Sequence, residues 1–258
     1  MPSRPDYGLD APGVVRNLVV VAAAGLGFFL SSRTVWSGLI PLGGGVLLDL
    51  RGMALGVGAT CALMAIWMIA SSKLGKVRGR EKLLDLHSWS GRERVLDVGC
   101  GRGLLLIGAA KRLRAGEGSA LGVDLWRAED LANNAKENTL ANARLEGVAD
   151  RVRVETADMR TLPLGDGSID LVVSKAAIHN LYAREERARA LGEIARVLAP
   201  GGEAILDDIR HLAEYAEALR ARGLEVRTKG NPVVAFLLML LTCGSLRPGL
   251  LIAKKPAA

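Results

Sequence analysis

Hydrophobic residues follow two different patterns along this chain. Two stretches near the N-terminus, residues 17–32 and 52–72, are apolar at nearly every position and contain no charged residue. From about residue 91 onward, short apolar runs alternate with stretches of helical periodicity. Continuous apolar stretches are typical of helices that cross a membrane, whereas alternating strands and helices are typical of a parallel α/β sheet. The pattern therefore predicts an N-terminal membrane region followed by an α/β domain.

The α/β part contains five apolar runs that we expect to be strands. They lie at residues 94–100, 119–125, 151–157, 169–176 and 202–208. Helical stretches are expected at residues 103–114, 128–145, 184–198 and 211–222, and candidate sixth and seventh strands at residues 224–229 and 249–254. This alternation favours a doubly wound, mostly parallel sheet, whose ligand binds outside the carboxyl ends of the strands.

The most informative motif joins the first strand to the first helix. Residues 95–103 read Val-Leu-Asp-Val-Gly-Cys-Gly-Arg-Gly. Glycine has no Cβ and adopts positive φ, so such a loop lets the backbone approach a small ligand closely. A dinucleotide fingerprint would need a third glycine at position 104, where this chain has Leu. The spacing of Gly99, Gly101 and Gly103 instead resembles the first motif of the class I S-adenosylmethionine (SAM) dependent methyltransferases.

Further motifs extend this resemblance over residues 91–258. Asp124 ends the second strand about 20 residues beyond the loop, and Asp158 ends the third strand. In this family the first acid accepts hydrogen bonds from ribose hydroxyls and the second accepts one from the adenine amino group. Leu-Ala-Pro-Gly-Gly from residue 198 looks like the family's turn before strand five. The resemblance implies a seven-stranded Rossmann-like methyltransferase sheet, with its last strand antiparallel and SAM as cofactor.

The resemblance also implies which residues bind the cofactor. They are Asp97, Gly99, Cys100, Gly101, Gly103, Asp124, Leu125, Asp158, Met159 and Ser174. Several have structural alternatives. Asp97 is equally explained as a carboxylate that pins the loop, Cys100 as a small residue that fills space, and Asp124 as a solvated acid. Asp166 and Asp170 compete with Asp158 because they lie nearby in the sequence.

Residues 174–182 follow the fourth strand, where this family brings methyl donor and acceptor together. They read Ser-Lys-Ala-Ala-Ile-His-Asn-Leu-Tyr. Methyl transfer requires alignment, exclusion of water and, for some acceptors, a base. His179 is the candidate base because imidazole titrates near neutrality, and Asn180 is a candidate orienting residue. A histidine bonded to loop backbone is the alternative, while His87 and His211 are expected to be structural or surface residues.

Composition and charge narrow the class of partner. The chain has 258 residues, of which 50% are hydrophobic, and a net charge of +7. Five basic residues directly follow the second apolar stretch: Lys73, Lys76, Arg78, Arg80 and Lys82. This cluster favours an anionic membrane over nucleic acid, since no RNA-binding or zinc-finger spacing is present, and ordinary solvated charges are the alternative. Cys61, Cys100 and Cys243 are too few and scattered for a disulfide or metal framework, so no metal site is predicted.

The two N-terminal stretches predict a helical hairpin in the membrane. Residues 52–72 are long enough to cross the hydrocarbon core at about 1.5 Å per residue. Gly52 and Gly56 have the small-residue spacing that permits a close helix contact. Residues 17–32 are shorter and would need arginine snorkelling or local thinning to cross. Pro41 and the glycines that follow it predict a turn between the two helices.

The sequence therefore predicts three regions. Residues 1–72 form a membrane region, residues 73–90 a basic juxtamembrane linker and helix, and residues 91–258 the methyltransferase domain. Because Lys and Arg are enriched on the cytoplasmic side, we expect a multi-pass protein of the cell membrane with its catalytic domain in the cytoplasm. A cleaved signal peptide is disfavoured, because the first apolar stretch starts late and lacks a strong basic segment. A soluble hydrophobic arm covering the catalytic domain remains an alternative.

These observations predict a membrane-anchored SAM-dependent methyltransferase that acts on a small lipophilic acceptor of the quinone, lipid or thiol type. The apolar residues 232–243 are too short to span a bilayer and favour a lid or membrane-dipping helix, with a core helix as the alternative. No Asn-Pro-Pro-Tyr-like sequence follows the fourth strand, which disfavours amino-group methylation on adenine or glutamine. No Pro-Cys pair occurs, which disfavours the covalent mechanism of cytosine methylation. A non-catalytic SAM-binding membrane module and a nucleotide-cofactor oxidoreductase are the competing functions. The oligomeric state stays open.

Overall fold

The chain folds into two compact units. The computed structural model describes residues 4–32, 34, 37–127, 129–230, 233, 236, 238, 240, 242, 244 and 246–257. One unit comprises residues 1–7, 77–127 and 133–258, and the other comprises residues 8–76 and 128–132. Residues 4–7, ahead of the first apolar helix, thus belong to the same compact unit as the C-terminal domain.

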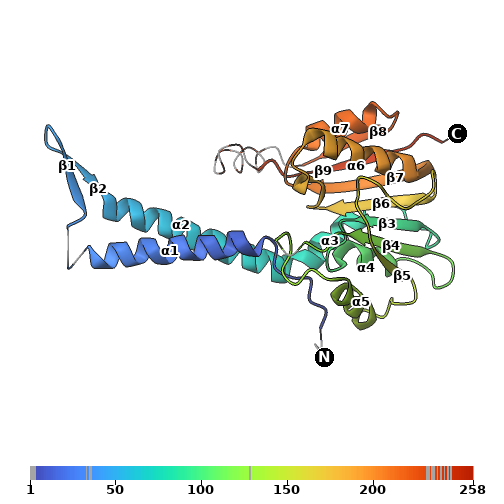
Figure 1. Cartoon of the computed structure of the whole chain (residues 1–258), viewed down its shortest axis with the longest axis horizontal. Helices are drawn as coiled ribbons and strands as arrows, with labels where there is room; N and C mark the ends of the chain where they lie inside the picture. Colours follow the sequence, from blue (N-terminus) through green and yellow to red (C-terminus); the bar gives the residue numbers. More distant parts are fainter. Residues whose placement is uncertain are drawn as a thin grey trace. The chain divides into compact units, whose positions relative to one another are not determined.

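The larger unit is built on a seven-stranded sheet of order β5-β4-β3-β6-β7-β9-β8, labelled in Figure 1. Its strands are β3 (Arg94–Val98), β4 (Ser119–Asp124), β5 (Val152–Thr156), β6 (Ile169–Lys175), β7 (Leu198–Asp208), β8 (Glu225–Lys229) and β9 (Gly249–Lys254). Strands β3 to β7 pair in parallel, whereas β9 runs antiparallel to both β7 and β8. The predicted Rossmann-like methyltransferase sheet and its antiparallel last strand are confirmed.

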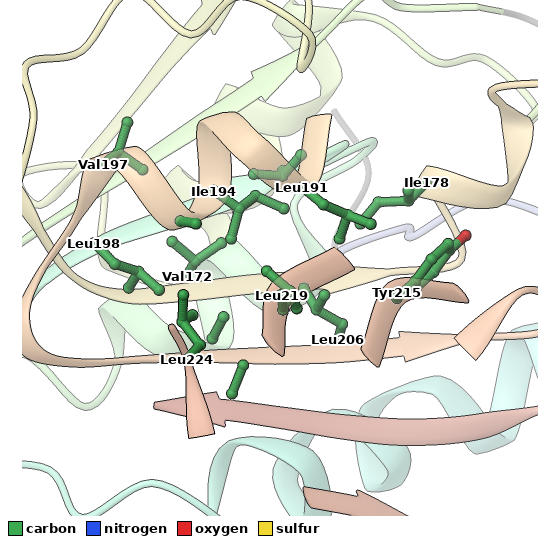
Figure 2. Packing of buried hydrophobic residues seen from close by; sticks show 14 of the residues in the cluster. Val172, Ile178, Leu191, Ile194, Val197, Leu198, Leu206, Tyr215, Leu219 and Leu224 are labelled. Carbon is green, nitrogen blue, oxygen red and sulfur yellow. The ribbon is translucent and has the colours of Figure 1, made fainter. Parts of the chain in front are cut away.

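Helices cover both faces of this sheet because its strands are apolar on both sides. They are α3 (Lys76–Leu84), α4 (Leu104–Ala110), α5 (Lys136–Leu145), α6 (Arg184–Val197) and α7 (Leu212–Arg220), with a short turn at η2 (Ile178–Asn180). The helical turn η1 (Ser71–Gly75) directly precedes α3 and belongs to the smaller unit. One core cluster packs α6 and α7 on the sheet, and another packs α3, α4 and α5. Figure 2 shows the first cluster, in which Leu191 and Ile194 of α6 meet Leu219 of α7.

The helix predicted over residues 128–145 begins only at Lys136, so its first half was predicted wrongly. A long-range pairing explains the difference. The N–H of Ala11 donates to the carbonyl of Asp130 (3.3 Å), and the N–H of Ala132 donates to the carbonyl of Leu9 (3.2 Å). These bonds hold the backbone extended in an isolated antiparallel bridge, and local helical periodicity cannot reveal them.

The smaller unit is an antiparallel helical hairpin. Helix α1 (Pro12–Ser31) and helix α2 (Leu50–Ala70) are joined by strands β1 (Leu39–Gly43) and β2 (Val46–Asp49). Both helices are long and apolar enough to cross a membrane, with mean hydropathies of 1.9 and 2.0 and only 6% and 11% of their apolar windows buried. Helix α1 starts five residues before the predicted stretch 17–32 and therefore needs no local thinning to span about 30 Å.

A glycine pair sets the closest contact between α1 and α2. A Cβ on Gly25 would lie 2.5 Å from the carbonyl oxygen of Ala54, and one on Gly58 would lie 3.3 Å from that of Ala22. The pair Gly52 and Gly56, expected from its spacing, does not make this contact: a Cβ at Gly56 would meet nothing within 4 Å, and one at Gly52 would meet only Asp49. Small residues on both helices let the backbones approach, a packing that is also found between membrane helices.

Replacing Gly25 should loosen the helical hairpin. Gly25→Leu forces a side chain into the backbone of α2, so we expect a destabilisation of about 1–3 kcal/mol. The measurement is thermal unfolding of the purified protein in detergent. Gly27→Leu is the matched control, since a Cβ at Gly27 meets nothing within 4 Å. Equal melting temperatures for the two variants would contradict the assigned contact.

Candidate functional site

The glycine loop between β3 and α4 bends at three residues with positive φ. The φ angles of Gly99, Gly101 and Gly103 are 72°, 51° and 83°. A Cβ on Gly99 would lie only 2.3 Å from the Cβ of Ala177, so this position accepts no larger residue. The N–H of Gly99 donates to the carbonyl of Val123 at 2.9 Å, which holds the loop at the carboxyl end of β4.

Asp97 lies beneath this loop and is buried. Its Oδ2 accepts the N–H of Leu106 in the first turn of α4 at 2.8 Å. Burial raises the pKa of Asp97 to about 8, and the negative charge of Asp124 acts in the same direction, against the bond from Leu106. Asp97 therefore joins strand to helix and pins the loop, which matches the structural alternative for this residue.

Asp124 ends β4 and gathers donors from three parts of the chain. Its Oδ2 accepts the N–H of Gly101 at 2.8 Å, and its Oδ1 accepts the N–H of Trp126 (2.6 Å) and the side-chain amide of Asn134 (3.2 Å). The Oδ1 atom of Asn134 is buried and, among the described residues, accepts no hydrogen bond. A ribose carries two neighbouring hydroxyls, each with one proton, so one can donate to Asp124 and the other can donate to Oδ1 of Asn134. The residues thus fit the ribose of the expected cofactor.

Asp158 follows β5 and forms a two-pronged ion pair with Arg160. The Nη2 of Arg160 lies 2.6 Å from its Oδ2, and the Nε lies 3.0 Å from both oxygens. Arg160 lowers the pKa of Asp158 below its usual value and also pairs with Glu186. The backbone N–H of Arg160 also donates to Oδ1 (2.9 Å), so each oxygen already accepts two contacts from Arg160, and a ligand donor would share this carboxylate with the guanidinium. The side chain of Met159 reaches toward Gly99, its methyl 3.7 Å from where a Cβ would lie.

The two acids that competed with Asp158 lie elsewhere. Asp170, near the start of β6, pairs with Arg94 at the start of β3 at 2.7 Å. Asp166 pairs with Arg196 of α6 at 2.7 Å. Because β3 and β6 are parallel, the Asp170 pair belongs to the opposite edge of the sheet from the glycine loop. Of the three acids, Asp158 is therefore the one at the carboxyl edge.

Three other expected cofactor residues differ in exposure. Leu125 is 42% exposed beside Asp124. The Sγ of Cys100 is buried where Gly122 leaves room, 2.7 Å from the position of an added Cβ, and burial raises the pKa of this thiol well above its ordinary value. The Ser174 hydroxyl is buried and donates to the carbonyl of Val98 at 2.8 Å. The side chains of Cys100 and Ser174 are thus used by the fold. The backbone of Cys100 is also bonded, its N–H to the carbonyl of Val123 and its carbonyl to the N–H of Gly103, and Ser174 lies within the paired strand β6.

His179 is held by a buried carboxylate that the sequence analysis missed. The Nδ1 atom of His179 lies 2.6 Å from Oδ1 of Asp208, which ends β7 and is 3% exposed. An ionised carboxylate only accepts hydrogen bonds, so Nδ1 carries a proton, and in the neutral imidazole the lone pair is on Nε2. No described residue bonds Nε2. The pair Asp207-Asp208 at the end of the predicted strand 202–208 was the signal that could have identified it.

Further bonds fix this carboxylate and the turn beside it. Asp208 also accepts from the N–H of His179 (3.2 Å), the N–H of Ile209 (2.7 Å) and the hydroxyl of Tyr215 (3.2 Å). Burial and the charge of Asp208 raise the pKa of Tyr215, which keeps its hydroxyl protonated. Figure 2 shows the ring of Tyr215 in the core cluster that includes Ile178. The imidazole therefore has a fixed tautomer and a rigid support.

The turn at η2 is closed by a second buried residue that the sequence analysis missed. The Nη1 atom of Arg187 donates to the carbonyls of Leu181 (2.7 Å) and Tyr182 (2.8 Å), and its guanidinium pairs with Glu214 of α7. Asn180 is half-buried in this turn, and no described residue bonds its side-chain amide. The side chain of Asn180 and the Nε2 atom of His179 are thus polar groups that could contact a methyl acceptor.

The remaining histidines have the structural surroundings expected for them. His87 bonds Glu203 at 2.9 Å and meets Trp89 edge-on, and His211 begins α7 with its Nδ1 3.8 Å from Glu214. Within the described ranges, no group of three or more His, Cys, Asp or Glu side chains is placed to hold a metal ion. The candidate chemistry is therefore concentrated at the carboxyl edge of the sheet.

Comparison with known sequences agrees with this geometry. Residues 95–202 match the family model described as a methyltransferase domain. The chain is 36% identical over 147 residues to a ribosomal protein L11 methyltransferase of Syntrophotalea carbinolica, covering 56% of this chain and 42% of that protein. It is 33% identical over 145 residues to a 27-O-demethylrifamycin SV methyltransferase of Amycolatopsis mediterranei, covering 55% and 48%. The chain spans about half the length of the curated relatives it matches.

Solved structures share the fold. The YcgJ protein of Bacillus subtilis superposes with a TM-score of 0.55 at 17% identity, over 70% of this chain and 99% of that one. The [4+2]-cyclase SpnF gives a TM-score of 0.55 at 20% identity, over 70% and 82%. At these identities the likeness shows the fold alone. The family match over residues 95–202 and this fold agree with a SAM-dependent methyltransferase domain, for which SAM is the cofactor.

The role of Asp124 can be tested directly. Asp124→Asn keeps the shape of the side chain but removes the charged acceptor, so we expect SAM binding to weaken by about 1.5–3 kcal/mol, or roughly 10- to 150-fold in Kd. Isothermal titration calorimetry of the full chain measures this affinity. Asp166→Asn is the control, because that acid pairs with Arg196 away from the loop. An unchanged Kd in Asp124→Asn would refute the assignment.

Proposed function

We propose that this chain, whose larger unit is a SAM-dependent methyltransferase domain, methylates a small lipophilic acceptor at a membrane surface. The observation that carries the catalytic part is the pairing of His179 with Asp208. A buried carboxylate that orients an imidazole is an arrangement suited to proton removal. Such a base favours catalysis over a module that only binds SAM. The relatives that are named methyltransferases favour it over an oxidoreductase.

The cofactor would be held by the glycine loop and by the two acids at the ends of β4 and β5. When bound, SAM supplies a methyl group made electrophilic by a positively charged sulfur. The backbone of Gly99 and Gly101 approaches the ligand, Asp124 accepts from ribose hydroxyls and Asp158 accepts from the adenine amino group. The exposed Leu125 offers apolar surface beside them. The protein's remaining tasks are to align the acceptor and to take its proton.

His179 is assigned to proton removal from an acceptor hydroxyl or thiol. For a hydroxyl acceptor, Nε2 would take the O–H proton while the oxygen forms a bond to the methyl carbon and the sulfur–methyl bond breaks. The products would be a methyl ether, the neutral thioether S-adenosylhomocysteine and an imidazolium at His179. Asp208 stabilises that positive charge through Nδ1. Asn180, in the same turn, is placed to orient the acceptor. The relative from Amycolatopsis mediterranei supports an oxygen acceptor, since its name states an O-demethylated substrate.

Membrane attachment is supported by the surface of the helical hairpin. Large apolar side chains are exposed on both helices: Val14, Val20, Leu26 and Leu30 on α1, and Met53, Leu63, Ile66 and Trp67 on α2. A soluble protein of this size rarely exposes such a continuous apolar surface. The alternative of a soluble arm would require these side chains to be covered by protein. A bilayer offers the same cover without a partner.

The fold of the larger unit constrains how the hairpin would cross. Tyr7 and Val77 belong to one compact unit, and the two apolar helices lie between them in the sequence. Both ends of the hairpin would then be on the same side of the membrane. Two helices that each cross once give this arrangement, because the second crossing returns the chain to its starting side. Lys73 and Lys76 follow α2, and Arg16 lies near the start of α1. By the positive-inside tendency this side is the cytoplasm, so the proposed location is the cell membrane with a cytoplasmic catalytic domain.

The lipophilic nature of the acceptor rests on this location and on residues between β8 and β9. Val233, Phe236 and Leu240 are 55–63% exposed, whereas most of the predicted lid at residues 232–243 lies outside the described residues. The named relatives act on acceptors as different as a ribosomal protein and a rifamycin. The relatives therefore do not indicate one class of acceptor, and the proposal of a lipid-phase acceptor rests on the membrane location and on these exposed apolar side chains. Membrane lipids are the other proposed partner, and nucleic acid is not expected.

The function is tested by incubating the full chain with methyl-labelled SAM and a membrane lipid extract. We expect labelled product in the lipid fraction by mass spectrometry. His179→Ala should lower turnover by about 10²- to 10⁴-fold, the usual contribution of general base catalysis, with SAM affinity nearly unchanged. His211→Ala is the matched histidine control. Full activity of His179→Ala would make this residue structural, and absence of label with wild-type protein would exclude a lipid acceptor.

The membrane topology is tested by cysteine labelling in a background where Cys61, Cys100 and Cys243 are replaced by alanine. Leu42→Cys, between the helices, should react with a membrane-impermeant maleimide in intact cells. Arg4→Cys should react only after the cells are permeabilised. If both sites required permeabilisation, the hairpin would not cross the membrane and the soluble arm would be favoured.

A further inference from the structure

Asp6 and Tyr7 lie ahead of the helical hairpin in the sequence and belong to the methyltransferase unit. The N–H of Asp6 donates to Oδ1 of Asn142 (3.0 Å), and its carbonyl accepts from Nδ2 of the same amide (2.9 Å). Asn142 lies on α5 and is 3% exposed. A buried amide that binds both backbone groups of one residue fixes that residue much as a strand partner would.

The same asparagine also reaches the glycine loop. Its Nδ2 donates to the carbonyl of Arg102 at 3.0 Å, between Gly101 and Gly103. The Nη1 of Arg102 in turn lies 3.1 Å from the carboxylate of Asp6. One turn earlier on α5, Thr139 donates to the carbonyl of Gly101 at 2.6 Å. Asp6 is therefore tied to the loop twice, through Asn142 by its backbone and through Arg102 by its side chain.

Tyr7 anchors this segment in the core. It is buried, its hydroxyl donates to Glu146 at the end of α5 (2.9 Å), and it accepts from the buried Arg80 of α3 (3.0 Å). The guanidinium of Arg80 lies 5.7 Å from the centre of the tyrosine ring. Burial raises the pKa of Tyr7, so the hydroxyl remains a donor throughout the physiological range. The anchor supplies the fixed point from which Asp6 can hold the loop.

We propose that Asp6 and Tyr7 form an N-terminal clasp that positions the glycine loop for the cofactor. The inference rests on the proposed binding of SAM at this loop and adds residues that no motif indicates. The clasp acts on Arg102, through Asn142 at its carbonyl and through Asp6 at its side chain, while Thr139 on the same helix holds the carbonyl of Gly101. A loop fixed before binding loses less conformational entropy when the ligand arrives, which increases affinity. Asp6 and Tyr7 are thus positioning residues for cofactor binding.

If Asp6 only stabilised the fold, its substitution would affect melting temperature and SAM affinity differently from a positioning residue. The carboxylate of Asp6 is 65% exposed, and exposed ion pairs contribute little to global stability. Removing it should therefore change the loop while leaving the unfolding of the sheet nearly unchanged. A stabilising contact without a positioning role would instead lower the melting temperature and leave SAM affinity as it was.

The test uses full-length Asp6→Ala, with Asp10→Ala as the matched control because Asp10 pairs with Lys76 outside this unit. We expect Asp6→Ala to raise the Kd for SAM roughly three- to tenfold, equivalent to a fraction of one to just over one kcal/mol. Hydrogen exchange of the peptide covering residues 99–106 should become faster, and that of β6 should not. Tyr7→Phe, which removes the hydroxyl bonds to Glu146 and Arg80, should act in the same direction.

A double variant with Arg102→Ala makes the test sharper. Because Asp6 and Arg102 share one contact, the effects of their substitutions on Kd should be less than additive. Unchanged Kd and unchanged loop exchange in Asp6→Ala would overturn the clasp, as would uniformly faster exchange across the sheet. If the wild-type chain failed to bind SAM at all, the proposed function would fail first. Binding by wild-type and Asp6→Ala with equal affinity would refute only the clasp.

Discussion

The contact between Gly99 and Ala177 brings the two halves of the candidate site together. With no Cβ at Gly99, the bend after β3 can lie directly against the segment that follows β6, and a Cβ there would come within 2.3 Å of Ala177. The first segment continues into the loop proposed to hold the cofactor, and the second continues into η2 and His179. Methyl transfer requires donor and acceptor groups in close alignment. A residue with a side chain at position 99 would separate the two segments.

Carboxylates of one chemical type serve different purposes at this edge of the sheet. Asp97 is enclosed by protein, and burial raises its pKa to about 8, which suits a group that holds strand and helix together. Asp158 faces Arg160, which lowers its pKa and keeps it an acceptor. Asp208 accepts from an imidazole, two backbone N–H groups and a tyrosine hydroxyl. Surroundings, more than residue type, decide what each acid does.

Much of this fold could be predicted because its information is local. Parallel strands buried on both faces read as continuous apolar runs, and the glycine spacing and strand-end acids at Asp124 and Asp158 have fixed places in such a sheet. What escaped prediction depends on contacts between distant residues. The extended segment before α5 pairs with Leu9 and Ala11, and Asp208 meets His179 only after β6 and β7 align. Arg160, Arg187 and Asn134 likewise gain their importance from partners that sequence spacing does not indicate.

The interrupted arrangement of the methyltransferase unit has a consequence for biogenesis. Asp6 and Tyr7 precede both apolar helices in the sequence, yet their partners Asn142 and Glu146 are synthesised more than 130 residues later. If the hairpin inserts into a bilayer as proposed, Asp6 and Tyr7 must stay on the face where Asn142 and Glu146 will fold. If they were translocated to the other face, the methyltransferase unit would lack these two residues however well the later chain folded. Completion of that unit would then depend on correct insertion of the proposed membrane hairpin.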